Sequence, residues 1–146
     1  MMNKSVKLGI QGRPDVPPRL FDLVPRYIEK YGYKDCLFAG KVNKQWVKYD
    51  GKKFYEITNS ISYGLLKLGV KKGDRIALIA NNAPEWNMID FAIQQVGAIC
   101  IPIYPTISHD DYKYIFNHSE ASIAFFTNKH LYSKVADIIA DIPTIK

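Results

Sequence analysis

The chain has 146 residues, of which 47% are hydrophobic and 23% charged, enough for one domain with a real core and too little for two. This composition excludes an intrinsically disordered chain. No apolar run approaches the ~20 residues of a bilayer-spanning helix, and no apolar segment follows the basic first residues, so we expect neither a membrane span nor a secretory signal.

The net charge of +6 is concentrated in the first third of the chain. Residues 1–53 contain twelve lysines and arginines and five acidic residues, whereas residues 54–146 contain eight and nine. A basic segment of this kind is typical of proteins that bind nucleic acid, acidic membranes or anionic cofactors. Its lysines are scattered singly, however, so we favour a solvated lysine-rich surface and expect no nucleic-acid partner.

The two cysteines lie in different settings. Cys100 belongs to the apolar run AICI and is expected to fill core space, whereas Cys36 lies near a predicted strand. This arrangement indicates neither a disulfide framework nor a metal site. A reducing compartment suits it best, and we expect a cytoplasmic protein, with peripheral membrane attachment as a further option.

The first half of the chain predicts an arm, a helix, a hairpin and a second helix. Residues 1–18 are polar, contain prolines and lack periodicity, which indicates a flexible arm. Residues 19–31 have helical spacing, with Asp22 as N-cap and Pro25 in the first turn. Residues 36–39 and 46–49 are predicted strands joined by the polar linker 40–45. After Asp50-Gly51 comes an amphipathic helix that ends at Gly69, with the apolar stripe Phe54, Ile57, Ile61, Leu65 and Leu68.

The second half alternates between strands and helices. Strands are predicted at residues 75–80, 98–103 and 122–126, with a further strand beginning at 144–146. The first helix between them is expected to be capped by Asn81 or Asn82 with Pro84 in its first turn. Ser108, with Asp111 as a weak capping box, is expected to begin the second, and residues 129–139 to form the third. Continuously apolar strands followed by helices predict an α/β fold: a parallel, doubly wound sheet with helices on both faces. Because the last predicted strand is cut short, we expect an incomplete domain.

Motifs with a recognised chemistry are not found. The sequence contains no glycine-rich phosphate loop and no G-x-S-x-G nucleophile elbow, and Gly69 and Gly73 are explained by a turn. The three histidines lie far apart, and adjacent acidic residues at a helix start favour the helix dipole over a metal. The residues concerned are His109, His118, His130, Asp110 and Asp111.

Two loops are nevertheless favoured as a site by the predicted topology. Parallel sheets bind ligands at the carboxyl ends of their strands, which here are followed by residues 81–85 (NNAPE) and 104–108 (YPTIS). Both loops are rich in hydrogen-bonding groups and contain proline. Capping of the following helices explains them more simply, so no residue is assigned a catalytic, cofactor-binding or metal-binding role.

Two segments resemble consecutive parts of the AMP-forming acyl-CoA synthetases of the adenylate-forming, AMP-binding superfamily. These are residues 68–86 (LGVKKGDRIALIANNAPEW) and 97–106 (GAICIPIYPT), and PIYPT is closer to the long-chain fatty-acid branch than to amino-acid or short-chain enzymes. Upstream, WVKYD leading into a helix agrees in order and spacing. The resemblance covers approximately residues 19–146.

The resemblance implies that residues 19–146 are the first part of an N-terminal AMP-binding domain, truncated at its C-terminus. Such an enzyme, a long-chain fatty acid:CoA ligase, uses ATP, Mg²⁺ and coenzyme A to make acyl-CoA through an acyl-adenylate, and its nucleotide-binding signatures lie further along the chain. The fragment itself is therefore expected to bind no cofactor, to be inactive, to need the remainder of the parent chain and to be prone to self-association. The alternatives are a stand-alone α/β ligand-binding module and a basic protein that binds nucleic acid or acidic membranes.

Overall fold

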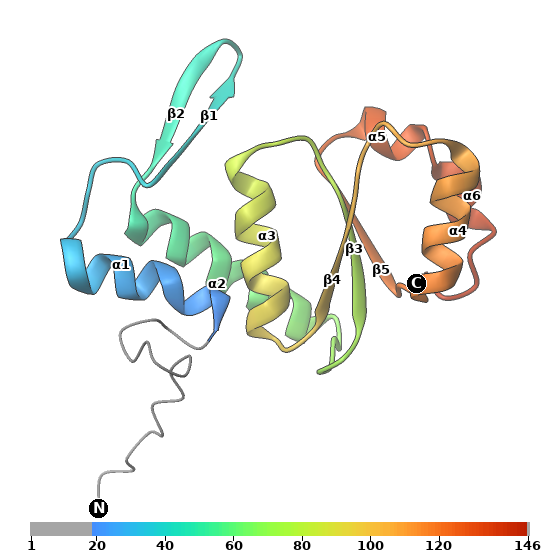
Figure 1. The fold of residues 1–146 in the computed structure, drawn as a ribbon, viewed down its shortest axis with the longest axis horizontal. Coiled ribbons are helices and arrows are strands. Elements are labelled where there is room, and N and C mark those ends of the chain that lie inside the picture. Colours follow the sequence, from blue (N-terminus) through green and yellow to red (C-terminus); the bar gives the residue numbers. More distant parts are fainter. Residues whose placement is uncertain (1–18, 146) are drawn as a thin grey trace, which may run out of the picture.

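The computed structural model describes residues 19–145, so the arm expected at residues 1–18 lies outside the described part. Figure 1 shows a central sheet of β3, β4 and β5 with helices to either side, and a β1–β2 hairpin that projects from one end. In chain order the described elements are a 3₁₀ turn (Leu20–Asp22), α1 (Leu23–Tyr31), β1 (Phe38–Val42), β2 (Gln45–Tyr49), α2 (Gly51–Lys67), β3 (Arg75–Ile79), α3 (Pro84–Gln95), β4 (Ile99–Ile103), α4 (His109–Ser119), β5 (Ile123–Phe126), α5 (Lys129–Ser133) and α6 (Ala136–Ala140).

The main sheet is parallel and is built around β3. Its strand order is β4-β3-β5, with Ile76 paired to Cys100 on one side and to Ile123 on the other. Residues 76–79 of β3 are completely buried. A strand that is covered on both faces reads as a continuous apolar run, which is why IALI allowed the parallel sheet to be predicted.

Alternate side chains of β3 point into different cores. Ile76 packs with residues of α2 and α3, whereas Ala77 and Ile79 pack with residues of α4, α5 and α6. The helices therefore cover both faces of the sheet, and the predicted doubly wound arrangement is confirmed. A third cluster lies beside the sheet and joins α1, α2 and α3 through Val24, Phe54, Met88 and Phe91.

The hairpin is longer and tighter than predicted. Strand β1 continues to Val42 and β2 begins at Gln45, so most of the linker expected at residues 40–45 is strand. The turn consists of Asn43 and Lys44, both with positive φ (50° and 66°), a geometry that suits the twist of two-residue hairpins. The prediction placed Gly40 in the linker, but the strand passes through it.

The base of the hairpin is docked on the start of α3. A Cβ atom at Gly40 would lie 2.7 Å from Cδ of Pro84, so only glycine allows the two backbones to approach this closely. Phe38 stacks on Phe54 of α2 with ring centroids 4.5 Å apart. The Tyr49 hydroxyl donates a hydrogen bond of 2.9 Å to Glu85. These contacts hold β1 and β2 against the body of the protein.

Helices α1 and α2 lie where they were predicted, but the predicted cap of α1 does not form its hydrogen bond. Asp22 precedes α1 and Pro25 lies in its first turn, but the Asp22 carboxylate pairs with Arg19 and makes no cap hydrogen bond. Asp50 does cap α2, accepting from the Lys53 N–H. Gly69 follows the end of α2 with a φ of 84°, as expected.

The apolar stripe predicted for α2 was wrong at its end and incomplete in its middle. Leu68 is 71% exposed because the chain leaves the helix there. The small polar residues Thr58 and Ser62 are buried instead, and Ser62 faces α3. The Ser62 hydroxyl lies within hydrogen-bond distance of the Ala92 carbonyl and the Gln95 side chain, which explains how a polar group is tolerated between two close helices.

The last predicted helix is broken in two. Helix α5 ends at Ser133 and α6 begins at Ala136, with Val135 in a non-helical conformation between them. Leu131, Val135 and Ile138 are nonetheless all buried, in the same core cluster.

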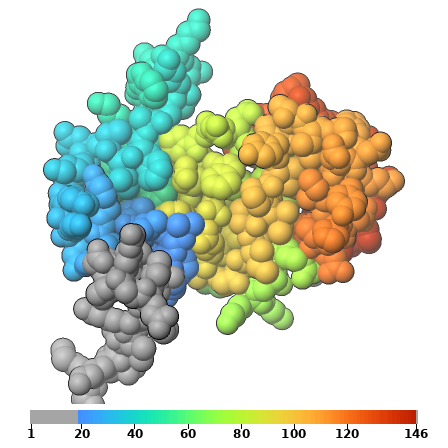
Figure 2. Space-filling model, viewed as in Figure 1, coloured from blue at the N-terminus to red at the C-terminus, as the bar shows by residue number. Residues whose placement is uncertain are grey.

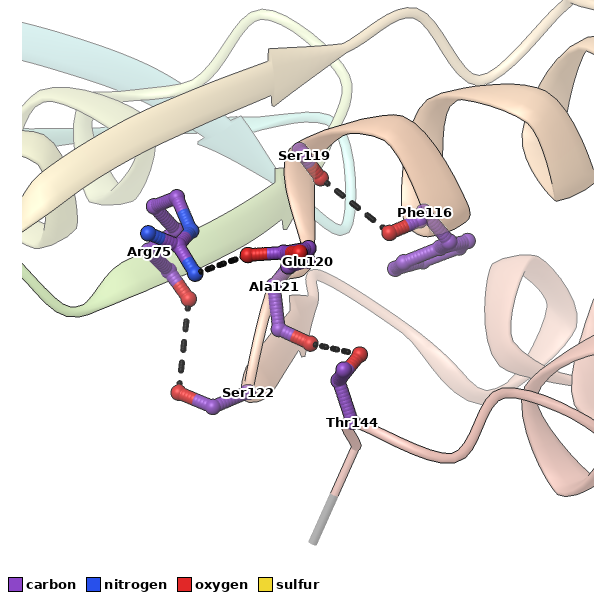
Figure 3. Close-up of polar contacts among 7 residues, drawn as sticks. All are labelled: Arg75, Phe116, Ser119, Glu120, Ala121, Ser122 and Thr144. Atoms are coloured by element: carbon purple, nitrogen blue, oxygen red, sulfur yellow. Dashed lines mark hydrogen bonds and ion pairs between the residues drawn. The ribbon is translucent and has the colours of Figure 1, made fainter.

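The strand expected at residues 144–146 is absent from the described part, which reaches residue 145. Thr144 lies in a turn, and its hydroxyl donates a 2.8 Å hydrogen bond to the Ala121 carbonyl (Figure 3). The same view shows the ion pair between Arg75 and Glu120, whose N and O atoms lie 2.7 Å apart. Beside it, Ser122 donates a hydrogen bond to the Arg75 carbonyl at the start of β3. The last described residues are thus tied back to the amino end of the sheet.

Strand β4 forms one edge of the sheet and carries a proline. The Ile99 N–H bonds to the Asp74 carbonyl, so alternate residues from Ile99 onward face β3. Pro102 is out of phase with them, and its nitrogen faces the open edge, where the missing N–H leaves no bond unmade within the sheet. Ile99 is 50% exposed at the same strand.

The two cysteines are both free, as the prediction of no disulfide requires. Cys36 is exposed, and its thiol is within 3.4 Å of the Phe38 carbonyl. Cys100 lies half-buried on β4. Burial, together with the negative charge of nearby Asp90, raises the pKa of the Cys100 thiol to about 12.

Replacing Gly40 with alanine is expected to destabilise the protein, because the added methyl group would overlap Pro84. Overpacking of this kind costs about 1–3 kcal/mol, measurable as a lower midpoint of urea unfolding. Gly64→Ala is the matched control, since a Cβ there meets nothing within 4 Å in the last turn of α2. That control should gain about 1 kcal/mol from helix propensity. Equal effects of the two substitutions would contradict the docking of the hairpin on α3.

The two thiols are expected to differ sharply in reactivity. With a pKa of about 12, the fraction of Cys100 present as thiolate at pH 8 is on the order of one in ten thousand, and the thiolate is the reacting species. Iodoacetamide should therefore label exposed Cys36 in the native protein and reach Cys100 only after unfolding. Mass spectrometry of the Cys36→Ser variant gives the test: rapid native labelling of this variant would contradict the raised pKa of the Cys100 thiol.

Candidate functional site

The two loops favoured by the sequence meet in one pocket. Residues 80–84 follow β3, residues 102–106 end β4 and enter the next loop, and both line a cavity of about 840 Å³. Because β3 and β4 are parallel neighbours, their carboxyl ends lie at the same edge of the sheet and bring the loops together. Trp86 and Asn87, in the first turn of α3, complete this part of the wall.

The loop after β3 leads directly into α3. Pro84 is the first residue of the helix, as predicted, and Ala83 is the N-cap in an extended conformation. The prediction that Asn81 or Asn82 caps this helix was wrong, because proline at the first position places the cap one residue before it. Both asparagines are exposed and line the pocket instead.

The loop after β4 is held at both ends. The Tyr112 hydroxyl of α4 donates to the Tyr104 carbonyl at 3.1 Å. Further along, Ser108 and Asp111 form a reciprocal capping box at the start of α4, which confirms the prediction. Burial raises the pKa of Tyr112, so its hydroxyl remains a donor throughout the neutral range. Between these supports, Tyr104 is 79% exposed at the mouth of the pocket.

The hairpin supplies a wall that the sequence analysis did not assign to the site. Phe38 and Ala39 of β1 line the pocket opposite the two loops. Their position depends on the Gly40–Pro84 contact and on the hydrogen bond from Tyr49 to Glu85, which, with burial, raises the pKa of Tyr49. Gly40 was the available signal, since glycine within a strand often marks a close approach of another backbone.

The pocket is neutral. Its lining consists of amides, hydroxyls, prolines, aliphatic side chains and the aromatic rings of Phe38, Trp86 and Tyr104, and all of these residues are uncharged at neutral pH. Such a surface suits an uncharged, partly apolar group and offers no side-chain cation to a phosphate. Glu85, the one acid in the favoured loops, is directed to Tyr49.

The remaining sequence candidates are not brought together. His109, His118 and His130 are exposed at separate positions on α4 and α5. Within residues 19–145, no group of three potential metal-ligating side chains is found, and no helix is long and apolar enough to cross a bilayer. Gly69 and Gly73 both have positive φ in the connection between α2 and β3, which confirms their interpretation as a turn.

Comparison with known proteins agrees with this architecture. The family model of AMP-binding enzymes matches residues 25–145. The long-chain-fatty-acid–CoA ligase FadD15 of Mycobacterium bovis is 35% identical over 57% of this chain and 14% of its own length. Long chain acyl-CoA synthetase 4 of Arabidopsis thaliana is 27% identical over 94% of this chain and 23% of its own length.

A solved structure shows the same fold. The anthranilate CoA ligase AuaEII, crystallised with anthranoyl-AMP, superposes with a TM-score of 0.74 at 20% identity, over 90% of this chain and 24% of that one. The chain thus spans less than a quarter of each of these three relatives. Because the family match covers nearly all of the described residues, this chain belongs to the family of AMP-binding enzymes.

Proposed function

We propose that this chain is the opening part of a long-chain fatty acid:CoA ligase of the AMP-forming type. The parent enzyme would join a fatty acid to coenzyme A at the expense of ATP, through an acyl-adenylate, releasing AMP and pyrophosphate. Adenylation is needed because a carboxylate is a poor electrophile without a good leaving group. The family match over residues 25–145 carries this proposal, together with relatives named as long-chain acyl-CoA ligases, of whose own length the match covers only 14% and 23%.

Within the parent, residues 19–145 would act as scaffold. The transfer of an adenylyl group requires cationic groups around the phosphates, and the neutral pocket at the carboxyl ends of β3 and β4 does not supply them. The described residues therefore do not fit a complete site for ATP, Mg²⁺ or coenzyme A, and we assign none of them to these groups. Their role is to position the two loops and the hairpin around the pocket.

The open edges of the main sheet support the proposal of an incomplete domain. Strands β4 and β5 each pair only with β3 among the described residues, and Ile99 on β4 is 50% exposed. We propose that the remainder of the parent chain covers these edges. In the isolated 146-residue chain the same edges would favour self-association.

The location we propose is the cytoplasm. Two free cysteines suit a reducing compartment, and the proposed reaction draws on ATP and coenzyme A. Fatty acid, ATP and coenzyme A are the proposed substrates of the parent.

One observation favours a second function for the chain on its own. The pocket is formed entirely by described residues and is large enough for a small neutral ligand. A stand-alone ligand-binding module would need no further residues. The absence of charged groups in this pocket limits such a ligand to uncharged or largely apolar compounds.

The proposal is tested by fatty-acid-dependent ATP–pyrophosphate exchange, measured with the purified 146-residue chain and with the full reading frame that contains it. We expect exchange with the longer protein, rising from short to long fatty acids, and none with the 146-residue chain. Exchange by the short chain would overturn the scaffold role. A reading frame that ends at codon 146 would favour the binding module, which equilibrium dialysis with fatty acids and adenosine would then examine.

A further inference from the structure

The outer half of the β1–β2 hairpin has no packing partner among the described residues. Figures 1 and 2 show it extending away from the body, beyond the base that is docked on α3. Apolar side chains are exposed along this part of the hairpin: Val42 is 50% exposed and Trp46 is 64% exposed in the outer half, and Val47, opposite Gly40 where the docked base ends, is 36% exposed. A protruding element in water ordinarily presents polar side chains, so these residues need an explanation.

The apolar residues lie on both faces of the hairpin. Cross-strand partners share a face, and the register pairs Gly40 with Val47 and Lys41 with Trp46. Val42 and Val47 therefore project from one face and Trp46 from the other. A surface that packs against one flat partner would need only one of these faces to be apolar. Apolar groups on both faces suit insertion of the tip into a soft apolar medium.

The same segment is strongly basic. Residues 38–49 contain Lys41, Lys44 and Lys48 and no acidic residue. Lys44 is at the turn, and the ammonium group of Lys41 lies 5.0 Å from the centre of the Trp46 ring. Tryptophan and lysine side chains are both favoured at the boundary between lipid headgroups and acyl chains, where an apolar body meets a charged layer.

The conformation of Lys44 strengthens this interpretation. Its φ of 66° is in the left-handed region, which lysine adopts at a steric cost and glycine adopts freely. Asn-Gly is the favoured pair for such a turn, whereas this chain has Asn43-Lys44. A charge is thus present at the tip in the place where glycine would fold better.

We propose that the tip of this hairpin binds the surface of an anionic lipid bilayer. Val42, Trp46 and Val47 enter the interface, and the three lysines lie against the lipid phosphates. Nucleic acid is the other anionic surface that lysines recognise, but valines on the opposite face to the tryptophan have no role in stacking or groove contacts. Membrane binding by the hairpin is independent of ligase activity.

Vesicle flotation with the purified 146-residue chain tests the proposal. We expect binding to vesicles of phosphatidylcholine and phosphatidylserine, weakening as salt rises, and little binding to phosphatidylcholine alone. Tryptophan fluorescence should shift to shorter wavelength on binding in the wild type, and this shift should be lost in Trp46→Phe. The other tryptophan, Trp86, lies in the pocket and serves as an internal reference.

Matched variants separate the hairpin from general basicity and from the open sheet edges. Changing Lys41, Lys44 and Lys48 to glutamine should weaken vesicle binding on the order of 100-fold, since each lysine near an anionic surface contributes about fivefold. The same change at the exposed residues Lys67, Lys71 and Lys72 removes equal charge far from the hairpin, at the last residue of α2 and in the connection that follows it. This change should have little effect. Equal losses from the two sets would overturn the proposal.

Lys44→Gly gives a test in which stability and binding move in opposite directions. It should raise the thermal midpoint by relieving the left-handed lysine, yet weaken vesicle binding about fivefold. An unchanged affinity for vesicles would contradict a role for the tip. Binding to duplex or single-stranded nucleic acid without binding to anionic vesicles would overturn the choice of partner.

Discussion

Complete burial of one strand organises this protein. Residues 76–79 of β3 have neighbouring strands at both edges and helices on both faces, and each large aliphatic side chain buried there stabilises the fold by about 1.5–3 kcal/mol. No other described strand is covered on all sides. Because β4 and β5 both run parallel to β3, the chain must cross a face of the sheet between strands, and α3 and α4 make those crossings. The meeting of two loops at one edge follows directly from this arrangement.

The base and the outer half of the hairpin differ in chemistry. Its base is apolar and docked, through Phe38, Gly40 and Tyr49, and there it completes the wall of the pocket. Its outer half is basic and carries Trp46 in solvent. The surface changes from apolar to basic within a few residues. Cross-strand pairing holds the outer half in the strand conformation without contacts to the core. Because the hairpin is anchored only at its base, it exposes the side chains of its outer half away from the body of the protein.

Much of the fold was predictable because its strongest signals are local. The run IALI, the capping pair Ser108 and Asp111, and the prolines at helix starts each act within a few residues. Two of the errors concern contacts between distant segments. Residues 40–45 looked like a polar linker because Pro84, which Gly40 contacts, is 44 positions away, and Thr144 looked like a strand because its bond to Ala121 is not encoded locally.

The candidate site was predictable only in part, for the same reason. A parallel sheet could be inferred from the alternation of strands and helices, and the rule for parallel sheets then favoured the loops at residues 81–85 and 104–108. The third wall could not be inferred, since nothing in the hairpin sequence states which loop it will face. The buried polar contact of Ser62 with α3 was also missed, because helical periodicity treats serine as a surface residue unless its partner is known.

The proline on β4 has a consequence for how this sheet forms. An extended chain that pairs with the edge strand β4 meets Pro102, which offers a carbonyl acceptor but has no N–H donor. Pairing of a foreign strand at this position is weaker because one ladder hydrogen bond cannot form. A partner that only donates a hydrogen bond to this residue can still bind. Pro102 thereby weakens edge-to-edge association of neighbouring molecules at this one position of β4.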